Sequence, residues 1–293
     1  MDTTGLRTFI TAAELESFSL AADQLFLTQP AVSKRLATLE DELGTSLFDR
    51  IGRRVFLTEA GRELLPRAKS ILNEIEDSRR LIANLAGTVT GRLSIGTSHH
   101  IGLHRLPPVL RNYSAQYPDV ELDLHFMDSE AACRAVLAGE LELGIVTLPP
   151  EPIDDLETEI IWPDPLSIVI NKDHPLATQS KTKLQELANT PAILPAHGTY
   201  TRELLEQAFA PKGLTLKTGM TTNYLETIKM MVSVGLGWSV LPETMLSKEI
   251  VTLNVNGINI SRQLGFVHHP RHTLSNAAKA IIGVLRDRRY IEK

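Results

Sequence analysis

The feature that most constrains this chain is a pair of short helices that we expect within residues 17–50. The first spans about residues 20–26, with small alanines at two positions where another helix must approach closely. The second spans about residues 30–43, and Thr28-Gln29-Pro30 separates the two. This is the spacing of a helix-turn-helix, whose second helix enters the major groove of DNA. The segment therefore predicts a DNA-reading element.

The second helix has two faces of different chemistry. Leucines and a valine recur at helical spacing, which predicts a buried stripe. Its members are Val32, Leu36, Leu39 and Leu43. Another stripe carries Gln29, Ser33, Lys34 and Ala37, which leaves polar side chains free to meet a groove.

Composition is that of an ordinary globular protein. The chain has 293 residues, of which 43% are hydrophobic and 22% charged, enough for two or three domains. No leader-like segment and no run of 18 apolar residues is visible, so we expect no membrane partner and a cytoplasmic, nucleoid-associated protein. The single cysteine, Cys133, excludes an internal disulfide and a multi-cysteine zinc site, and it predicts a buried small residue rather than a redox sensor.

Net charge is −5, so binding to nucleic acid must depend on where the basic residues lie. Residues 1–62 hold seven basic and nine acidic side chains. Five of the basic ones fall at 34–35 and 50–54, whereas acidic residues 40–42 lie at the far end of the second helix. Residues 48–57 predict two short strands around Gly52, and the arginines beside that turn are suited to phosphate contacts.

A long helix should follow. Thr58 can cap a helix that reaches about residue 86, with Pro66 in its first turns. Apolar and small residues at 64, 68, 71, 75, 78, 82 and 85 repeat every 4 and 3 residues, as in a coiled-coil seam. We expect this seam to bind a second copy of the chain, with packing against the rest of its own chain as the alternative. The expected dimer residues are Leu64, Ile71, Ile75, Ile82 and Leu85.

The remaining chain alternates strands and helices, which predicts an α/β domain with mostly parallel sheets. We expect strands near 92–96, 120–126, 142–146, 166–171, 192–194, 215–220 and 237–241, and helices near 104–116, 129–138, 183–188, 200–210, 224–234 and 274–290. Pattern alone leaves open whether these form one sheet or two lobes.

The N-terminal segment resembles the winged helix-turn-helix of the LysR-type transcriptional regulators over about 65 residues. The resemblance rests on Ala21-Ala22, Gln29-Pro30-Ala31-Val32-Ser33, Leu39-Glu40, Leu43-Gly44, Leu47-Phe48, Arg50, Leu57-Thr58 and Ala60-Gly61. It implies a fold of three parts: an N-terminal winged helix-turn-helix (1–62), a linker and dimerisation helix with a hinge (58–90), and a two-lobed, periplasmic-binding-protein-like α/β effector domain (91–293). Lobe I would span about 91–162 and 268–293 and lobe II about 163–267, with crossovers near 162–166 and 263–268.

The resemblance also implies function: a sequence-specific regulator that binds double-stranded DNA, forms a homodimer or homotetramer, contacts RNA polymerase and responds allosterically to a small effector. The expected DNA-binding residues are Thr28, Gln29, Pro30, Ser33, Lys34, Arg35, Arg50, Arg53 and Arg54. Activation and repression, the operator and the effector stay open.

Hydroxyls and free amides follow several strands of the expected α/β domain, where ligands of such sheets bind. These groups suit a small anion, although each hydroxyl could instead be a helix cap. The expected ligand residues are Thr97, Ser98, His99, Thr147, Thr199, Tyr200, Thr201, Arg202 and Asn223. Positions 97–98, 199–202 and 223 also match where the resemblance implies an effector cleft.

Histidines gather near the same strand ends, at 99, 100, 104 and 197. We interpret them as neutral structural or ligand-binding groups and expect no metal and no cofactor, because neither a His-Glu-x-x-His helix nor cysteine support is present.

No nucleophile elbow, Walker loop or dinucleotide fingerprint occurs, so we expect no enzyme. The alternative is a small-molecule-binding or catalytic α/β protein with an N-terminal domain that binds a protein partner; salt-sensitive, sequence-specific DNA binding separates the two. A purely architectural DNA protein would show weak sequence preference and no ligand response.

Overall fold

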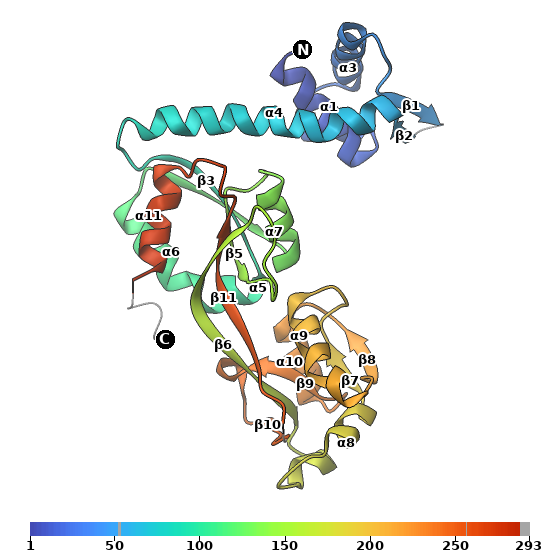
Figure 1. The fold of residues 1–293 in the computed structure, drawn as a ribbon, viewed down its shortest axis with the longest axis vertical. Coiled ribbons are helices and arrows are strands. Elements are labelled where there is room, and N and C mark those ends of the chain that lie inside the picture. The colour runs from blue at the N-terminus through green and yellow to red at the C-terminus, as the bar shows by residue number, and fades with distance from the viewer. Residues whose placement is uncertain (52–53, 256, 288–293) are drawn as a thin grey trace. The chain divides into compact units, whose positions relative to one another are not determined.

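The computed structural model describes residues 1–51, 54–255 and 257–287, which divide into two compact units between Ala86 and Gly87. The elements of the first unit are α1 (Thr3–Leu15), α2 (Phe18–Gln24), α3 (Gln29–Leu43), β1 (Phe48–Ile51), β2 (Arg54–Leu57) and α4 (Glu59–Asn84) (Figure 1). This order is that of the predicted helix-turn-helix, wing and linker helix. No helix in the described part of the chain is long and apolar enough to cross a membrane.

Side-chain caps set where the helices of the first unit begin. Asp2, Ser17, Thr28 and Thr58 each accept a hydrogen bond from a backbone amide in the first turn of α1, α2, α3 and α4, respectively. Such caps satisfy amides that have no partner within the helix. Helix α3 ends at Gly44, whose φ of 68° is left-handed and suits glycine at a helix C-terminus.

The core of the first unit lies between α1, α2, α3 and the base of α4, and it includes Phe9, Phe18, Val32, Leu36 and Leu39. The predicted stripe of α3 is therefore buried, with one exception. Leu43 is 39% exposed, because the last turn of α3 extends past this core. The Glu40 carboxylate, also near the end of α3, holds the segment that follows the helix. It accepts hydrogen bonds from the backbone amides of Leu47 at 2.6 Å and Phe48 at 3.2 Å.

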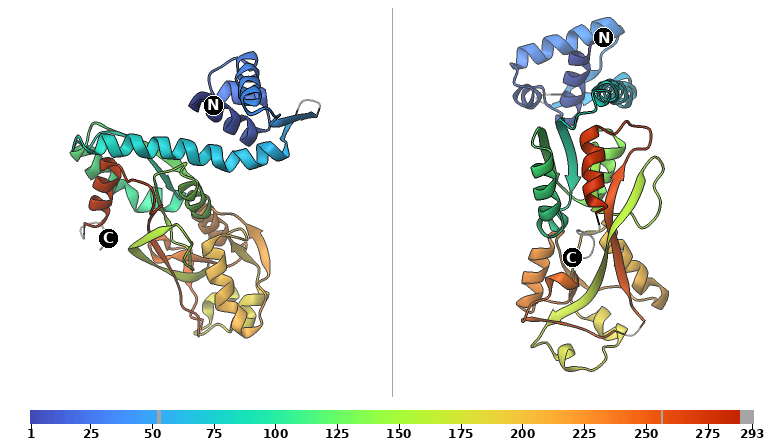
Figure 2. Two further views of the ribbon diagram at one scale, coloured as in Figure 1. Left: turned by 45° about the horizontal axis from the view of Figure 1, so that its top comes forward. Right: turned by 90° about the vertical axis from the view of Figure 1, so that its left-hand side faces the viewer.

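In the second unit the described elements are β3 (Gly91–Thr97), α5 (His99–His104), α6 (Leu106–Gln116), β4 (Val120–Phe126), α7 (Ser129–Leu137), β5 (Leu143–Thr147), β6 (Glu157–Asn171), α8 (Leu184–Asn189), β7 (Ala192–Leu194), α9 (Tyr200–Phe209), β8 (Thr218–Thr221), α10 (Leu225–Ser233), β9 (Ser239–Pro242), β10 (Ile250–Thr252), β11 (Ile260–His268) and α11 (Asn276–Leu285). Short 3-10 turns lie at 175–178, 210–212 and 243–245. Figure 2 shows the same ribbon from two further sides.

Four hydrophobic clusters, two in each lobe, mark the division of this unit into lobes. In lobe I, α6 and α11 cover one face of the sheet formed by β4, β3, β5 and the end of β11, and α7 covers the other. Strand alternation explains the division: Leu93 and Ile95 face the first core, whereas Gly96 faces Ala132 of α7. In lobe II, α8 and α9 pack on one side of β6, β7 and β9, and α10 packs on the other.

Strands β6 and β11 connect the lobes. They pair antiparallel from Ile260↔Leu166 to His268↔Glu157, with an irregularity at Leu264/Gly265 (Figure 1). A side chain at Gly265 would meet the Glu159 carbonyl oxygen at 1.9 Å, so only glycine permits this close approach.

Several predictions for this unit need correction. The sheets are mixed, because β11 pairs antiparallel with β5 and β6, and β6 pairs antiparallel with β9 and β10; only β3–β4, β3–β5 and β7–β8 are parallel. Leu264 and Phe266, near the expected second crossover, pack in the same hydrophobic cluster as Leu93 and Ile95. The expected last helix ends at Leu285, and residues 288–290 of its predicted range lie outside the described part.

Candidate functional site

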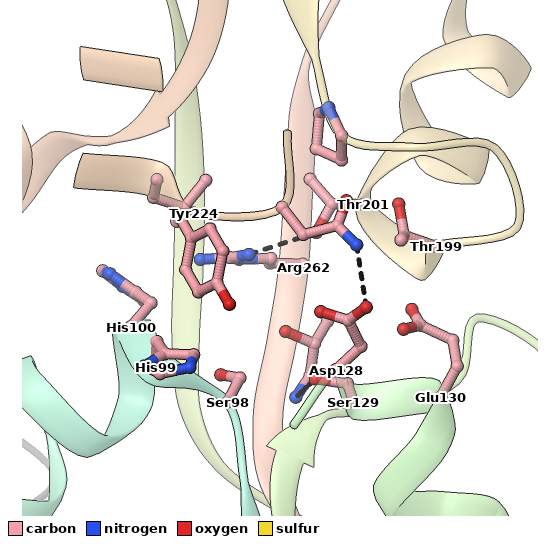
Figure 3. Close-up of a pocket in the computed structure, with 14 residues that line it drawn as sticks. Ser98, His99, His100, Asp128, Ser129, Glu130, Thr199, Thr201, Tyr224 and Arg262 are labelled. Carbon is pink, nitrogen blue, oxygen red and sulfur yellow. Dashed lines mark hydrogen bonds between the residues drawn. The ribbon is translucent and has the colours of Figure 1, made fainter. Parts of the chain in front are cut away.

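A cavity of about 60 Å³ lies between the two lobes, and four helices begin at its wall. From lobe I come the starts of α5 and α7 and the end of β5. From lobe II come the starts of α9 and α10, and Arg262 reaches the cavity from β11. The lining residues are Ser98, His99, His100, Asp128, Ser129, Glu130, Thr147, Pro195, Thr199, Thr201, Asn223, Tyr224, Leu225 and Arg262 (Figure 3).

Arg262 brings a buried cationic side chain to this cavity, and only 5% of the residue is exposed. Its Nε donates to Asp164 Oδ2 at 2.6 Å and its Nη1 to Thr201 Oγ1 at 3.1 Å. Its Nη2 is buried and has no hydrogen-bond partner among the described residues. Arg105 shares the same carboxylate, with Nη2 3.6 Å from Asp164 Oδ1. These two guanidinium groups and the one carboxylate carry a single net positive charge among themselves.

Two carboxylates from the start of α7 join the lobes. Asp128 Oδ2 accepts a hydrogen bond from Asn223 Nδ2 at 2.8 Å, and Glu130 accepts one from the Tyr200 amide at the start of α9. Burial raises the pKa of Glu130 above its usual value, despite that hydrogen bond. The Glu130 carboxylate therefore takes up a free amide of α9 that could otherwise bind an external anion.

Imidazoles form another part of the wall. The His99 ring packs against Tyr224 with centroids 4.8 Å apart and against Phe126 at 5.5 Å. His100 is buried beside it, and burial together with the nearby charge of Arg262 lowers the His100 pKa to about 3. His100 is thus neutral at physiological pH.

Six of the nine expected ligand residues line the cavity: Ser98, His99, Thr147, Thr199, Thr201 and Asn223. Ser98 and Thr199 also cap α5 and α9, so their hydroxyls serve both the helices and the wall. Sequence reasoning had treated these two roles as alternatives.

Thr97, Tyr200 and Arg202 do not line the cavity. Thr97 shares the inward face of β3 with Leu93 and Ile95, and its hydroxyl donates to the Ile145 carbonyl at 2.8 Å. The Tyr200 side chain packs against the core beneath α7. Arg202 is buried on another side of α9, where it donates to Glu206 at 2.5 Å and Thr218 at 3.1 Å.

Arg262, Asp128, Glu130 and Tyr224 line the cavity but were not among the expected residues. Arg262 lies within a strand rather than at a strand end, so only the crossing of β11 brings it here. Asp128 and Glu130 begin the helix after β4, and the same strand-end reasoning could have found them. His104 and His197 lie outside the lining.

The expected DNA-binding residues lie on α3 and the wing. Thr28, Gln29, Pro30 and Lys34 are exposed, and Ser33 is half-buried. Gln29 Nε2 donates to Ser33 Oγ at 2.8 Å, which orients the amide along one side of the helix. Arg35 and Lys34 line one groove together with Asp2 and Glu42. The backbones of Arg50 and Arg54 belong to β1 and β2, and Arg53 lies outside the described residues.

The expected dimer residues occupy most of α4. Leu64 packs partly against the core of the first unit and Ala68 is buried in it, so the start of the stripe has an intramolecular role. Farther along, Ile75 is half-buried, whereas Ile71, Ile82 and Leu85 are 37%, 64% and 78% exposed. Among the described residues of the expected seam, Ile71, Ile82 and Leu85 are thus the exposed members.

Comparison with known proteins agrees with this arrangement. Residues 3–62 match the family model of the "bacterial regulatory helix-turn-helix protein, lysR family", and residues 86–289 match the "LysR substrate binding domain". The chain is 31% identical to the RuBisCO operon transcriptional regulator of Allochromatium vinosum, over 94% of this chain and 92% of that protein.

Solved structures share the fold. A full-length OxyR variant from Pseudomonas aeruginosa superposes with a TM-score of 0.71 at 24% identity, covering 100% of this chain and 97% of that one. The CcmR regulatory domain of Synechocystis PCC6803 in complex with 2-PG superposes with a TM-score of 0.61 at 25% identity, covering 67% of this chain and 96% of that one.

Proposed function

This chain belongs to the LysR family of DNA-binding transcriptional regulators, and from that premise we propose that a small anionic metabolite, bound in the cavity between lobes I and II, controls how it binds DNA. The proposed division has a DNA-reading head (1–62), a linker helix with a hinge (58–90) and the two-lobed effector unit from residue 91. Within that unit we place lobe I at about 91–162 and 268–293 and lobe II at about 163–267, with crossovers near 162–166 and 263–268.

Arg262 carries the argument for an anion. A buried guanidinium with an unpaired Nη2 has a high desolvation cost unless a partner satisfies it. A carboxylate or phosphate at the cavity wall would supply that partner and would meet hydroxyls of Ser98, Thr147 and Thr201. The relative that binds 2-PG supports this class of ligand.

The hydrogen bonds across the cavity suggest how such a ligand would act. Glu130 and Asp128 hold lobe II through the Tyr200 amide and Asn223. An external anion near these groups competes with the two carboxylates for the same donors and repels them. Binding would therefore favour a different lobe angle, which is the differential interaction that an allosteric ligand requires.

The DNA side of the proposal assigns roles by chemistry. Gln29, Pro30 and Ser33 would meet bases or the adjacent backbone, whereas Lys34, Arg35 and the wing arginines at 50, 53 and 54 would bind phosphates. The uncovered part of the α4 seam would pair with a second copy, so that two heads grip two half-sites. A change in lobe angle would then alter the spacing of the two DNA-reading heads on the bacterial chromosome, in the cytoplasm. It would also alter the contact of the regulator with RNA polymerase.

Effector binding is tested by calorimetry on the full-length chain, with 2-PG as the first probe and a panel of small carboxylates and phosphate esters after it. Arg262→Lys keeps the charge but removes the planar fork, and we expect it to weaken binding roughly 10- to 150-fold, the equivalent of about 1.5–3 kcal/mol. Thr201→Val should weaken binding in the same direction.

Arg105→Lys is the matched control, because Arg105 pairs with the same Asp164 but does not line the cavity. We expect that variant to bind the probe as the parent does. Anisotropy with a duplex selected from a random library then measures DNA affinity with and without the probe. Equal losses in the two lysine variants, or no loss in either, would refute the anion site.

A further inference from the structure

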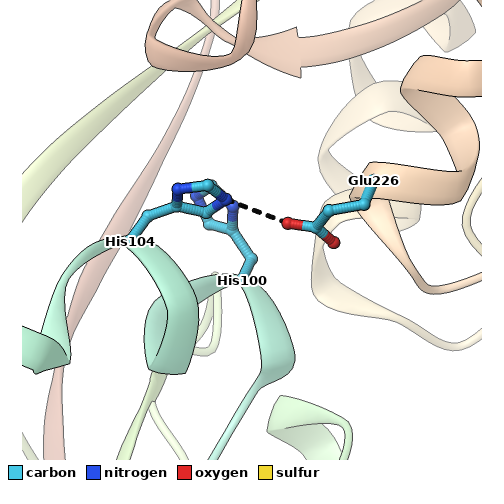
Figure 4. A group of neighbouring side chains, drawn as sticks. All are labelled: His100, His104 and Glu226. Atoms are coloured by element: carbon cyan, nitrogen blue, oxygen red, sulfur yellow. Dashed lines mark hydrogen bonds and ion pairs between the residues drawn. The ribbon is translucent and has the colours of Figure 1, made fainter.

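Three side chains of the two lobes meet beside the ligand cavity, and of these only His100 also lines it. His100 and His104 lie one turn apart on α5, with ring centroids separated by 4.9 Å. Glu226, in the first turn of α10, reaches across from lobe II, and its Oε1 lies 3.0 Å from His104 Nε2 (Figure 4). One ligand atom from each residue lies within 4.8 Å of the other two. Glu226 is 122 residues from His104 in the sequence, so only the tertiary fold assembles this group.

His100 is the unusual member of the group. It is 5% exposed, and neither ring nitrogen has a hydrogen-bond partner in the part of the chain that the structure describes. An imidazole that is buried with both nitrogens unpaired has lost its hydrogen bonds to water, and no hydrogen bonds within the protein replace them. The two other side chains, 40% and 39% exposed, stay open to solvent and to an incoming ion.

We propose that His100, His104 and Glu226 form a binding site for a divalent transition metal ion of the Zn²⁺ type, which ties lobe I to lobe II. Two imidazole nitrogens and one carboxylate oxygen are a donor set that Zn²⁺ prefers, with a fourth position left open. Histidines four residues apart on a helix present both rings to one ion. Bound metal would supply the partner that His100 lacks.

The geometry needs only a small closure. Ligand atoms about 2.0–2.1 Å from a tetrahedral zinc ion lie roughly 3.3–3.5 Å from one another. The separations here are 4.8 Å or less, so side-chain rotation or a slight approach of α10 to α5 brings them into range. Because the three ligands belong to different lobes, the ion favours the lobe angle at which all of them reach it.

Neighbouring charges set the expected strength of the site. Arg262 and Arg105 face His100 and oppose a cation, and Asp164 between them offsets one of the two charges. The Glu226 carboxylate offsets part of the charge of the ion itself. Burial alone would raise the Glu226 pKa, but its own amide and His104 donate hydrogen bonds that hold it below the usual value. We therefore expect weaker binding than at a site with the same ligands and no adjacent arginine.

The test uses the full-length chain, stripped with a chelator and titrated calorimetrically with ZnCl₂. We expect one tight ion per chain, a raised unfolding temperature, and a visible absorption band of tetrahedral type when Co²⁺ replaces Zn²⁺. His104→Ala and Glu226→Gln should each lower the Zn²⁺ affinity at least tenfold and weaken the Co²⁺ band. Both residues are partly exposed, so circular dichroism should show an intact fold.

His125→Ala is the matched control. The His125 ring forms the same kind of pair with a carboxylate, Nε2 to Asp123 Oδ2 at 2.9 Å, but no third ligand atom from the residues that the structure describes joins it. This variant should bind Zn²⁺ as the parent does. Absence of a stoichiometric site in the parent, or equal affinity in all three variants, would overturn the proposal. His104 and Glu226 do not line the anion cavity, and the Zn²⁺ titration contains no 2-PG, so failure of the anion site leaves this result independent.

Discussion

Ile82→Glu in α4 should dissociate the dimer that we propose for this regulator. Ile82 is 64% exposed in the isolated chain, and it lies in the uncovered seam with Ile71 and Leu85. The exposed parts of these three residues amount to nearly two complete side chains per protomer. Burying them in a symmetric pair would contribute about 5–11 kcal/mol before the entropic costs of association.

The magnitude for one position follows from the same areas. Covering the exposed part of Ile82 in both protomers accounts for about 2–4 kcal/mol. Losing that contribution corresponds to a roughly 30- to 1,000-fold weaker dimer, and a carboxylate placed in an apolar seam adds to the loss.

Sedimentation velocity over a concentration series measures the effect, and Leu81→Glu provides the control. Leu81 is 52% exposed and adjacent to Ile82, but it lies off the repeat that forms the seam. We expect Leu81→Glu to change the dimer constant much less. If both variants sediment as the parent does, or if Leu81→Glu dissociates the dimer more strongly, the seam lies on another surface.

Three further predictions concern the described contacts. Gln29→Ala should relax base preference and cost about 1–3 kcal/mol of DNA-binding free energy at the preferred site, whereas Lys34→Ala should weaken binding to all duplexes alike and reduce the salt slope of the binding constant by about one. Anisotropy at several salt concentrations separates the two variants, and identical salt slopes would contradict the assignment. Glu40→Ala should lower the free energy of unfolding by about 1–3 kcal/mol, because the Leu47 and Phe48 amides lose their acceptor. Urea denaturation measures the change, and an unchanged midpoint of the unfolding transition would contradict the prediction. Because burial raises the Glu130 pKa above 4.5, ionisation of Glu130 lowers the stability of the fold as pH rises from 4.5 through the folded pKa. Glu130→Gln should remove that fall in thermal melts. An unchanged pH profile in this variant would show that Glu130 does not cause the fall.

Sequence alone determined the parts of this protein that depend on local pattern. The helix-turn-helix follows from a stripe at helical spacing in its second helix, and the structure buries Val32, Leu36 and Leu39 of that stripe. Thr199 and Asn223 could be assigned to a ligand wall because helices that follow strands begin at the same edge of a sheet. Thr97 belongs to the same expected set, but its strand parity with Leu93 and Ile95 turns its side chain into the interior of lobe I, where its hydroxyl donates to the Ile145 carbonyl.

Tertiary structure decided what depends on long-range pairing. Arg262 lies inside β11, and its place at the cavity results from the antiparallel crossing of β6 and β11, which local periodicity does not encode. Arg202 follows Thr201 directly, yet the helical turn of α9 sends it to Glu206 and away from the wall. Glu226 reaches His104 across 122 residues. Spacing along the chain fixes which side chains share a face, whereas the meeting of two faces depends on packing free energy summed over the whole unit, so it appears only in the folded structure.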